Sequence, residues 1–412
     1  MPTIIEKIFQ MHTEDKVEAG NTIWLNIDLR TARDFAGAKV VKNLLKHYSS
    51  EYIEDATKTF FTFDCNAPAN TIEYANNQQI CREFARKNGI KVYDVGRGIG
   101  SHVVIEEGLA YPGITAVGTD SHFNILGSVG AFGQGMGDID IAFVFKTGKT
   151  WFEVPETVKV NFIGTPSAPW SAKDLALLCV KELRRKVLGR AIEFYGEIVD
   201  ELSLAGRITL ASMVTEMGGI IGFIPPNREV INFCSKRSGK EIKPVYADDA
   251  TYEKEIDIDV SNLEPLIALP PSPSNVKRVR DVHDIKVDSV FIGSCTNGRM
   301  EDMQAVAKIL KGKKIAENIT LKVVPATREV WREMMNGEIM KELFNAGAII
   351  SHSACAGCAS GQIGMTGEGE VQVSTSNRNF KGKQGAGDTY LASPETAAAS
   401  ALTGYITGVD EI

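Results

Sequence analysis

The sequence predicts an α/β protein of two or three domains, in which parallel or mixed sheets are flanked by helices. Three observations predict this fold class. The chain has 412 residues, which is too many for one compact core. Strand and helix patterns alternate over residues 287–350, and the N-terminal third mixes the same two patterns. We expect domains at 1–127, 128–275 and 276–412.

The alternation is most regular in the C-terminal third. It consists of strand 287–294, helix 299–310, strand 319–326, helix 328–336 and a short apolar run at 347–350. This order implies a parallel sheet with right-handed crossovers. Ligands bind just beyond the carboxyl ends of the strands in such sheets. The segments GSCTNG (293–298) and SHSACAGC (351–358) follow the first and third strands, so both are expected at one edge.

The remaining segments give weaker patterns. They predict helix 80–88, strands 89–96 and 113–122, helices from about 172 to 205, and a half-solvated strand at 255–262. Three prolines interrupt 267–278, so we expect an extended connector between domains there. The glycine clusters 96–100 and 133–137 do not match the dinucleotide-binding pattern. They are expected to let backbone segments approach closely.

Composition excludes some classes of protein. Lys and Arg number 45 against 52 Asp and Glu, for a net charge of −7. This balance argues against a protein built to hold nucleic acid or anionic lipid. No apolar run is long enough to span a bilayer. The N-terminus carries acidic residues and lacks the apolar stretch of a signal peptide, so we expect a cytoplasmic protein.

The seven cysteines are mostly scattered, and their number is odd, so no disulfide framework is expected. Cys81, Cys179 and Cys234 are interpreted as ordinary core residues, since small thiols are often buried. The close pair is different. Cys355 and Cys358 follow the third strand of the predicted sheet, and Cys295 follows the first. Three thiols at one sheet edge can hold a metal.

Three kinds of site would use these thiols. A structural zinc would need a fourth ligand, for which His352 is close in sequence. A redox C-x-x-C pair would leave Cys295 unexplained. An iron–sulfur cluster could be held by three cysteines with one iron left open as a Lewis acid. The segment STSNRNFKGK (374–383) offers hydroxyls, amides and cations suited to carboxylates, and Asp-Ser-His at 120–122 follows a predicted strand.

Taken together, these segments resemble the aconitase family, and within it the large subunits of two-subunit hydro-lyases of the 3-isopropylmalate dehydratase type. The resemblance runs in order along nearly the whole chain. Its motifs are FDCNAP (63–68), GIGSHVVIEEGLAYPG (98–113), GTDSHFNILGSVGAFGQGMGD (118–138), SMVTEMGG (212–219), GSCTNGR (293–299), CAGC (355–358), STSNRNFKGKQG (374–385) and YLASPETAAASALTG (390–404).

The resemblance implies an aconitase-like three-domain arrangement around a central iron–sulfur site. It implies that Cys295, Cys355 and Cys358 ligate a [4Fe–4S] cluster. The open iron would act on a small 2- or 3-hydroxy dicarboxylic acid, from which water is lost and to which it is re-added. The implied catalytic residues are Asp64, His102, Asp120, His122 and Glu216, and the implied substrate-binding residues are Ser121, Asn377 and Arg378.

The chain departs from the family at a few positions. Cys65 follows Asp64 where the family has a His, its candidate proton donor to the leaving hydroxyl. Lys383 lies where the family has an Arg. A flexible ammonium therefore replaces a guanidinium that can bind a carboxylate through two hydrogen bonds. Phe123 replaces the usual Thr after Asp-Ser-His, and Arg33 lies where relatives carry a His or Gln that contacts substrate. We count Cys65 among the catalytic positions, and Lys383 and Arg33 among the substrate-binding ones.

The resemblance also implies a partner. The serine that removes the substrate proton would lie on a small swivel-domain subunit, giving a heterodimer or heterotetramer, with leucine biosynthesis as the implied setting. Hydration of dimethylmaleate, citraconate or a homoaconitate-like acid is an alternative activity. Two alternatives belong to other functional classes: RNA binding by a cluster-free form, and a scaffold protein that has lost catalytic activity. We expect no nucleic-acid or membrane partner.

Overall fold

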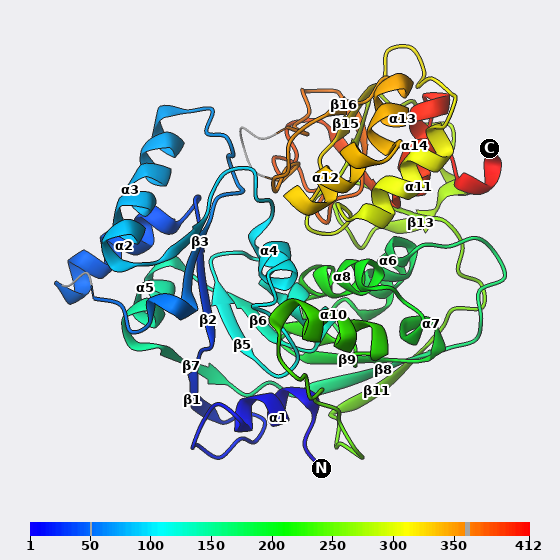
Figure 1. Ribbon diagram of the computed structural model, residues 1–412. Coiled ribbons are helices and arrows are strands. Elements are labelled where there is room, and N and C mark those ends of the chain that lie inside the picture. Colours follow the sequence, from blue (N-terminus) through cyan, green and yellow to red (C-terminus); the bar gives the residue numbers. More distant parts are fainter. Residues whose placement is uncertain (50–51, 359–362) are drawn as a thin grey trace. The chain divides into compact units, whose positions relative to one another are not determined.

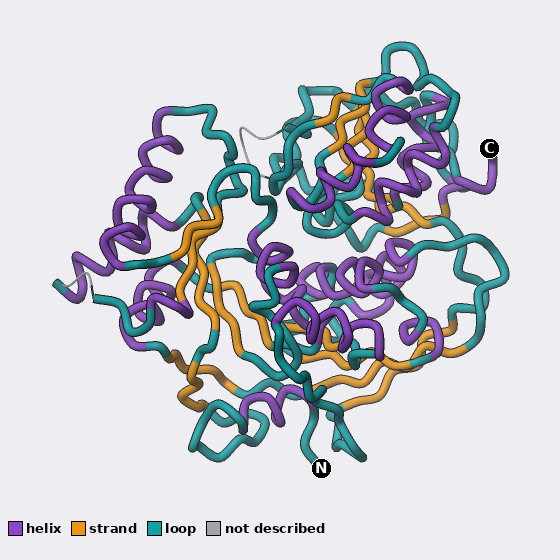
Figure 2. The backbone as a smooth tube through the Cα atoms, in the orientation of Figure 1, coloured by secondary structure: helices purple, strands orange, loops and turns teal. Residues whose placement is uncertain are grey.

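The computed structural model describes residues 1–49, 52–358 and 363–412. The chain divides into two compact units. Figure 1 labels their helices and strands. Unit 1 comprises 1–95, 100–162 and 187–258, and unit 2 comprises 96–99, 163–186 and 259–412. The three domain boundaries expected from the sequence stay a prediction. In both units, helices flank β-sheets (Figure 2), so the predicted α/β class is confirmed.

Unit 1 is built on a five-stranded parallel sheet with the order β4-β3-β2-β5-β6. Its strands are β2 (Leu29–Arg33), β3 (Thr59–Thr62), β4 (Lys91–Tyr93), β5 (Thr115–Gly118) and β6 (Phe132–Gly135). The associated helices are α1 (Ile4–Gln10), α2 (Gly37–Tyr48), α3 (Ile72–Asn88), α4 (Gly100–Glu106), α5 (Asp138–Thr147), α8 (Leu204–Ser212), α10 (Arg228–Ser238) and the 3-10 helix η2 (Phe123–Val129).

Helices cover both faces of this sheet because its strands are apolar on both sides. Phe61 and Val117 face a core that includes residues of α2, α3 and α5. Their neighbours Phe60 and Ala116 face a second core that includes residues of α4, η2, α8 and α10. Successive side chains of a strand point to opposite faces, so a strand buried twice reads as a continuous apolar run.

Two smaller sheets complete unit 1. A four-stranded sheet has the order β10-β9-β8-β11 and a two-stranded ribbon pairs β1 with β7. Their bounds are β1 (Thr22–Asn26), β7 (Lys149–Glu153), β8 (Thr157–Ile163), β9 (Ala191–Tyr195), β10 (Ile221–Phe223) and β11 (Lys254–Asp259), and short helices α7 (Glu197–Asp200) and α9 (Val214–Met217) lie nearby in sequence. The strands predicted at 89–96, 113–122 and 255–262 and the helix at 80–88 are all present.

Unit 2 contains a seven-stranded sheet with the order β13-β12-β18-β17-β14-β15-β16. Its strands are β12 (Leu266–Ala268), β13 (Val276–Arg278), β14 (Ser289–Ile292), β15 (Thr320–Val323), β16 (Ile349–Ile350), β17 (Val371–Ser374) and β18 (Asp388–Ala392). Its helices are α6 (Ala172–Leu183), α11 (Met300–Leu310), α12 (Arg328–Asn336), α13 (Ile339–Ala346) and α14 (Pro394–Thr403). The predicted alternation over 287–350 is confirmed, with β14, β15 and β16 parallel.

Two expectations need correction. Residues 267–278 are not a connector between domains, because β12 and β13 pair as antiparallel strands within the unit 2 sheet. The prolines lie between the strands, where no ladder hydrogen bond is required of them. The helical stretch expected over 172–205 is interrupted, since β9 separates α6 from α7. β9 is buried on both faces, and periodicity alone does not separate such a strand from a helix.

One glycine of each cluster illustrates the close approach that the sequence predicts, whereas Gly96 has open space beside it. A Cβ on Gly98 would lie 2.3 Å from the Ala326 carbonyl oxygen, and one on Gly135 would lie 2.4 Å from the Asp120 carbonyl oxygen. Only glycine permits such close backbone approach. Within the described ranges, no helix combines the length and apolar character needed to cross a membrane.

Candidate active site

Three neighbouring strands of unit 1 bring an arginine and two aspartates together. β2 ends at Arg33, Asp64 follows β3, and Asp120 follows β5. Because β2 lies between β3 and β5, the guanidinium falls between the two carboxylates. Arg33 donates through Nε to Asp64 Oδ1 at 2.7 Å and through Nη1 to Asp120 Oδ1 at 3.1 Å. We call Arg33, Asp64 and Asp120 the carboxylate centre.

The two aspartates of this centre have different proton affinities, although both are buried. Burial raises the pKa of Asp64 to about 6, against the opposing effect of Arg33. Burial also acts to raise the pKa of Asp120, but Arg33, His122 and hydrogen bonds outweigh it and lower this pKa below its ordinary value. One of those bonds comes from Ser101 Oγ, which donates to Asp120 Oδ2 at 3.1 Å. Asp120 is therefore the ionised member and Asp64 the one able to retain a proton.

The loop after β3 is held by an aspartate that sequence reasoning missed. Asp34 Oδ1 accepts hydrogen bonds from the backbone N–H groups of Asp64 and Cys65, at 3.2 and 2.9 Å. Its Oδ2 accepts from Asn66 N at 3.1 Å and Gln78 Nε2 at 3.1 Å. Ligand atoms of Asp34, Asp64 and Cys65 lie within 4.8 Å of one another. Since four donors already engage Asp34, we assign it an anchoring role and no metal.

Cys65 occupies the position next to Asp64 in this loop. Its side chain is 5 % exposed, and its sulfur lies 3.5 Å from Asp64 Oδ1 in donor geometry. Burial, the largest influence, raises the pKa of the Cys65 thiol well above its ordinary value. The side chain is therefore a neutral thiol, and it cannot provide the positive charge that an imidazolium would provide.

The Asp-Ser-His segment places a histidine against a glutamate. His122 Nε2 lies 3.1 Å from Glu216 Oε1, and both side chains are almost fully buried. Glu216 comes from α9, which is distant in sequence, so the structure brings these two predicted residues together. Ser121 is exposed, and its Oγ lies 3.4 Å from His122 Nδ1. His102 is fully buried in α4.

Unit 2 gathers the three predicted cysteines. Cys295 follows β14 and the pair Cys355 and Cys358 follows β16, so they reach the same edge of the parallel part of the unit 2 sheet. The three pack in one small cluster with Ile99 and Ala326. Cys295 and Cys355 are each 3 % exposed, and the sulfurs of Cys355 and Cys358 lie 3.8 Å apart. We call the three cysteines the cysteine centre.

The predicted STSNRNFKGK segment lies at the same sheet edge, because β17 pairs in parallel with β14 and ends at Ser374. Asn377 is 1 % exposed and donates through Nδ2 to the sulfur of Cys295 at 3.2 Å. Arg378 and Lys383 are half-buried, and Phe380 is exposed. The cysteine centre therefore has an amide donor on one sulfur and cations in the neighbouring loop.

These residues fit a cluster that is held by three thiolates. An amide N–H directed at Cys295 sulfur favours a sulfur that carries negative charge, as a ligating thiolate does. The candidate fourth ligand of a zinc site fits less well, since His352 is exposed while the cysteines at 295 and 355 are buried. Gly357 gives the loop its turn, with φ of +77° and a side without Cβ that faces the Phe291 ring.

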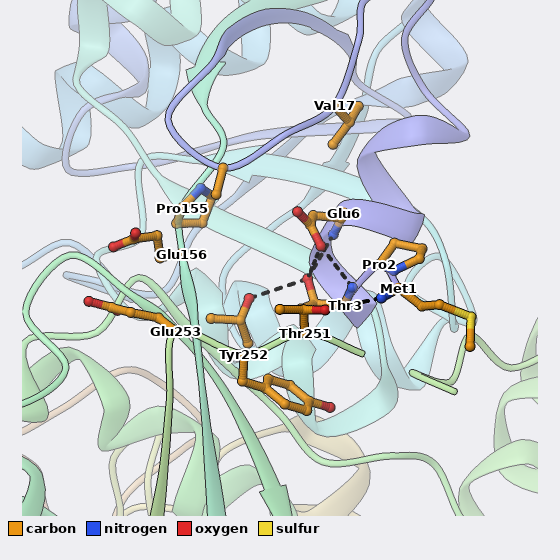
Figure 3. Close-up of a pocket in the computed structure, with 12 residues that line it drawn as sticks. Met1, Pro2, Thr3, Glu6, Val17, Pro155, Glu156, Thr251, Tyr252 and Glu253 are labelled. Atoms are coloured by element: carbon orange, nitrogen blue, oxygen red, sulfur yellow. Dashed lines mark hydrogen bonds between the residues drawn. The ribbon is translucent and has the colours of Figure 1, made fainter. Parts of the chain in front are cut away.

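One cavity of unit 1 is lined by other residues. It has a volume of about 480 Å³ and is lined by the N-terminal segment together with residues 155–157 and 251–253 (Figure 3). The Met1 amino group donates to Thr251 Oγ1 there, and Thr3 and Glu6 form a capping box at the start of α1. These contacts hold the N-terminal segment in place. None of the predicted site residues lines this cavity.

Comparisons with known proteins identify the class as a hydro-lyase of the aconitase family. The family model for the aconitase family (aconitate hydratase) matches residues 6–284 and 275–404, and the chain belongs to this family. It is 42 % identical over 410 residues to 3-isopropylmalate dehydratase large subunit 1 of Methanopyrus kandleri, covering 98 % of each chain.

Two further comparisons add to this. The chain is 42 % identical over 388 residues to a probable methanogen homoaconitase large subunit of Methanosarcina mazei, covering 93 % of this chain and 98 % of the relative. The crystal structure of Thermococcus kodakaraensis aconitase X in its holo-form is similar with a TM-score of 0.52 and 14 % identity, covering 86 % of this chain and 84 % of that one. At that identity the second likeness shows the fold alone.

Proposed function

We propose that this chain is the cluster-bearing large subunit of an enzyme that dehydrates and rehydrates a small 2- or 3-hydroxy dicarboxylic acid of the 3-isopropylmalate type. One observation carries the proposal: in a chain of the aconitase family, three cysteines gather at one sheet edge and an asparagine amide is directed at Cys295 sulfur. The cytoplasm as the place of the reaction and leucine biosynthesis as its setting stay predictions.

Cys295, Cys355 and Cys358 would hold a [4Fe–4S] cluster. When bound, such a cluster supplies a Lewis acid that polarises the carbon–oxygen bond of a hydroxy acid. Hydroxide is a poor leaving group, so this polarisation must be matched by a proton donor. Both needs have to be met for water to leave.

The carboxylate centre and the His122–Glu216 pair would handle protons. Neighbouring carboxyl groups with unequal pKa values divide into an acid and a base. Asp64, with a pKa of about 6, would hold the proton, while Asp120 would remain charged and orient Arg33. The contact between Glu216 Oε1 and His122 Nε2 would fix the orientation of the imidazole ring and provide a path for a proton between the two side chains.

The cations of the 374–383 segment would bind the substrate carboxylates. Arg378 and Lys383 are half-buried, so part of each side chain remains accessible to a ligand. A carboxylate held by a cation is better able to accept the charge that develops when the neighbouring C–H bond is broken. Arg33 was expected to bind substrate too, but two of its nitrogens already engage Asp64 and Asp120, and we propose that it organises these acids instead.

A small subunit would complete the enzyme. The relatives at 42 % identity carry the name large subunit, which supports a heteromeric enzyme. We propose that the partner contributes the serine that removes the substrate proton, in a heterodimer or heterotetramer. A homoaconitate-type acid is a second candidate substrate, because one of those relatives is named a probable homoaconitase.

The test is to produce the chain with its candidate small subunit, purify both anaerobically, and follow enoate absorbance with a panel of di- and tricarboxylic acids. The panel contains 3-isopropylmalate, homoaconitate, dimethylmaleate and citraconate. We expect turnover of at least one acid by the pair, and none by the large subunit alone. Turnover that is unaffected by Arg378→Met and by Cys355→Ser would contradict the proposal.

A further inference from the structure

Lys173 is a fully buried lysine that the proposed reaction does not use. It lies in the first turn of α6 and its exposed fraction is 0 %. Lysines are rarely buried to this degree unless their ammonium groups are hydrogen-bonded. Here Nζ donates to the Thr375 carbonyl oxygen at 3.0 Å and to the Ser376 carbonyl oxygen at 2.6 Å.

These two carbonyls lie directly before Asn377. The Ser376 carbonyl belongs to the peptide that carries the Asn377 N–H, so Lys173 grips the backbone one residue from the side chain that donates to Cys295 sulfur. Two successive carbonyls held by one ammonium fix the direction of the chain after β17. The Thr375 amide is held in turn by the Phe291 carbonyl at 3.0 Å.

The Gln384 side chain also holds this segment through hydrogen bonds. Gln384 Nε2 donates to the Arg378 carbonyl oxygen at 2.6 Å and also to Ser376 Oγ. Its Oε1 accepts from Ser374 Oγ at 2.9 Å. The backbone from 374 to 378 is therefore braced by one charged and one neutral side chain, although it belongs to a loop.

We propose that Lys173 is a positioning residue that holds the 375–377 backbone so that the Asn377 amide remains directed at Cys295 sulfur. Charge-assisted bonds are about twice as strong as neutral ones, so the lysine is the stronger brace. Removing it frees the peptide before Asn377 and weakens the N–H···S bond. This inference rests on the proposed function only where it concerns the cluster.

The first test uses amide hydrogen exchange in the full chain as purified anaerobically. In Lys173→Met, the amides of Thr375 and Ser376 should exchange about tenfold faster than in the wild type. The matched control is Lys322→Met, which removes another buried ammonium of unit 2, one that contacts Ser289 and Glu370. It should leave exchange at 375–376 unchanged. Equal exchange at 375–376 in Lys173→Met and wild type would overturn the proposal.

Should Lys173→Met not fold, Lys173→Gln replaces it, since the shorter amide can reach at most one of the two carbonyls. The same direction of change is expected, and its absence has the same consequence.

The second test measures the reduction potential of the cluster in anaerobic holoprotein. Hydrogen bonds to ligating sulfurs raise such potentials, so Lys173→Met and Asn377→Ala should both shift the potential to more negative values. Lys173→Arg keeps a positive charge at this position, so its potential should lie closer to the wild-type value than that of Lys173→Met. A wild-type protein without a cluster would refute the proposed function, and the exchange result would still decide the role of Lys173. A cluster whose potential is the same in Lys173→Met would refute its link to Cys295.

Discussion

The two centres are built in contrasting ways. In the carboxylate centre of unit 1, a buried arginine lies between two buried aspartates at adjacent strand ends. In the cysteine centre of unit 2, three sulfurs gather at a sheet edge, and the sulfur of Cys295 accepts a hydrogen bond from the neutral amide of Asn377. The first centre brings its own counter-charge, whereas the second is arranged as a ligand set.

This contrast indicates which interactions stabilise each centre in the folded chain. The aspartates depend on Arg33, because an unpaired buried charge is costly. The cysteines have no such counter-charge among them and form a set of candidate metal ligands instead. Substitutions in the carboxylate centre should therefore lower the free energy of unfolding. Substitutions in the cysteine centre should lower metal content and activity.

The largest stability effect is expected from Arg33→Met, which leaves Asp64 and Asp120 buried without their cation. We expect the free energy of unfolding to fall by about 3–5 kcal/mol at pH 8, as measured by urea denaturation. The control is Arg82→Met, because Arg82 pairs with Asp94 near the surface. That variant should lose no more than about 1 kcal/mol. Equal losses in the two variants would mean that the carboxylate centre is not a buried ion network.

The next effect concerns the pH dependence of stability in unit 2. Burial raises the pKa of Asp174 to about 7, although it accepts bonds from Ser171 and Leu266. The folded chain thus binds this proton more tightly than the unfolded chain does. Asp174 therefore contributes about 2–4 kcal/mol to the free energy of unfolding below about pH 4, and this contribution is lost as the pH rises to about 7.

Asp174→Asn should remove the contribution of Asp174 from the pH profile of unfolding, while Asp64 and Asp302, whose pKa values burial also raises, should keep theirs. Asp284 is exposed, and Asp284→Asn should leave the profile as it is in the wild type. A wild-type stability that rises between pH 4 and 7 and is unaffected by Asp174→Asn would show that the buried carboxyl is ionised.

A smaller effect, on activity, is expected from Glu216→Gln. This change keeps the shape of the side chain but removes the charge next to His122 Nε2, so kcat should fall by about 10²-fold. Glu201 is exposed in the same unit, and Glu201→Gln should retain wild-type turnover. Comparable kcat values for Glu216→Gln and wild type would remove the His122–Glu216 pair from the proton pathway.

The smallest effect concerns substrate choice. Cys65→His restores an imidazole next to Asp64, and Lys383→Arg restores a bidentate fork. Each should change the ratio of kcat/KM between two diacids by about tenfold. If neither variant changes the turnover of any diacid, both positions lie outside the site.

Much of this fold could be predicted from the sequence where local pattern and order suffice. β14, α11, β15 and α12 have strong periodicity, and their order alone places Cys295 and the 355–358 pair at one edge. The pairing of β12 with β13 could not be predicted, because prolines are compatible with both a connector and a turn. Periodicity does not say which distant strands become neighbours.

The same limit applies to the site. The sequence points to Asp64, Asp120, His122, Glu216 and Arg33, but not to the position of the arginine between two of these acids. Arg33 was expected to contact substrate, because nothing in one sequence shows that β2 lies between β3 and β5. Lys173 looks like an ordinary surface residue of an amphipathic helix, and only the tertiary structure shows its burial.

The most direct test of the central claim is the iron and sulfide content of the anaerobically purified chain, measured with its visible absorption. We predict about four irons and four sulfides per chain, in line with a [4Fe–4S] cluster. Both should be lost in Cys355→Ser and kept in Cys179→Ser, because Cys179 is buried in α6 and packs in the core. A colourless protein that contains zinc, or iron that remains in Cys355→Ser, would contradict the account.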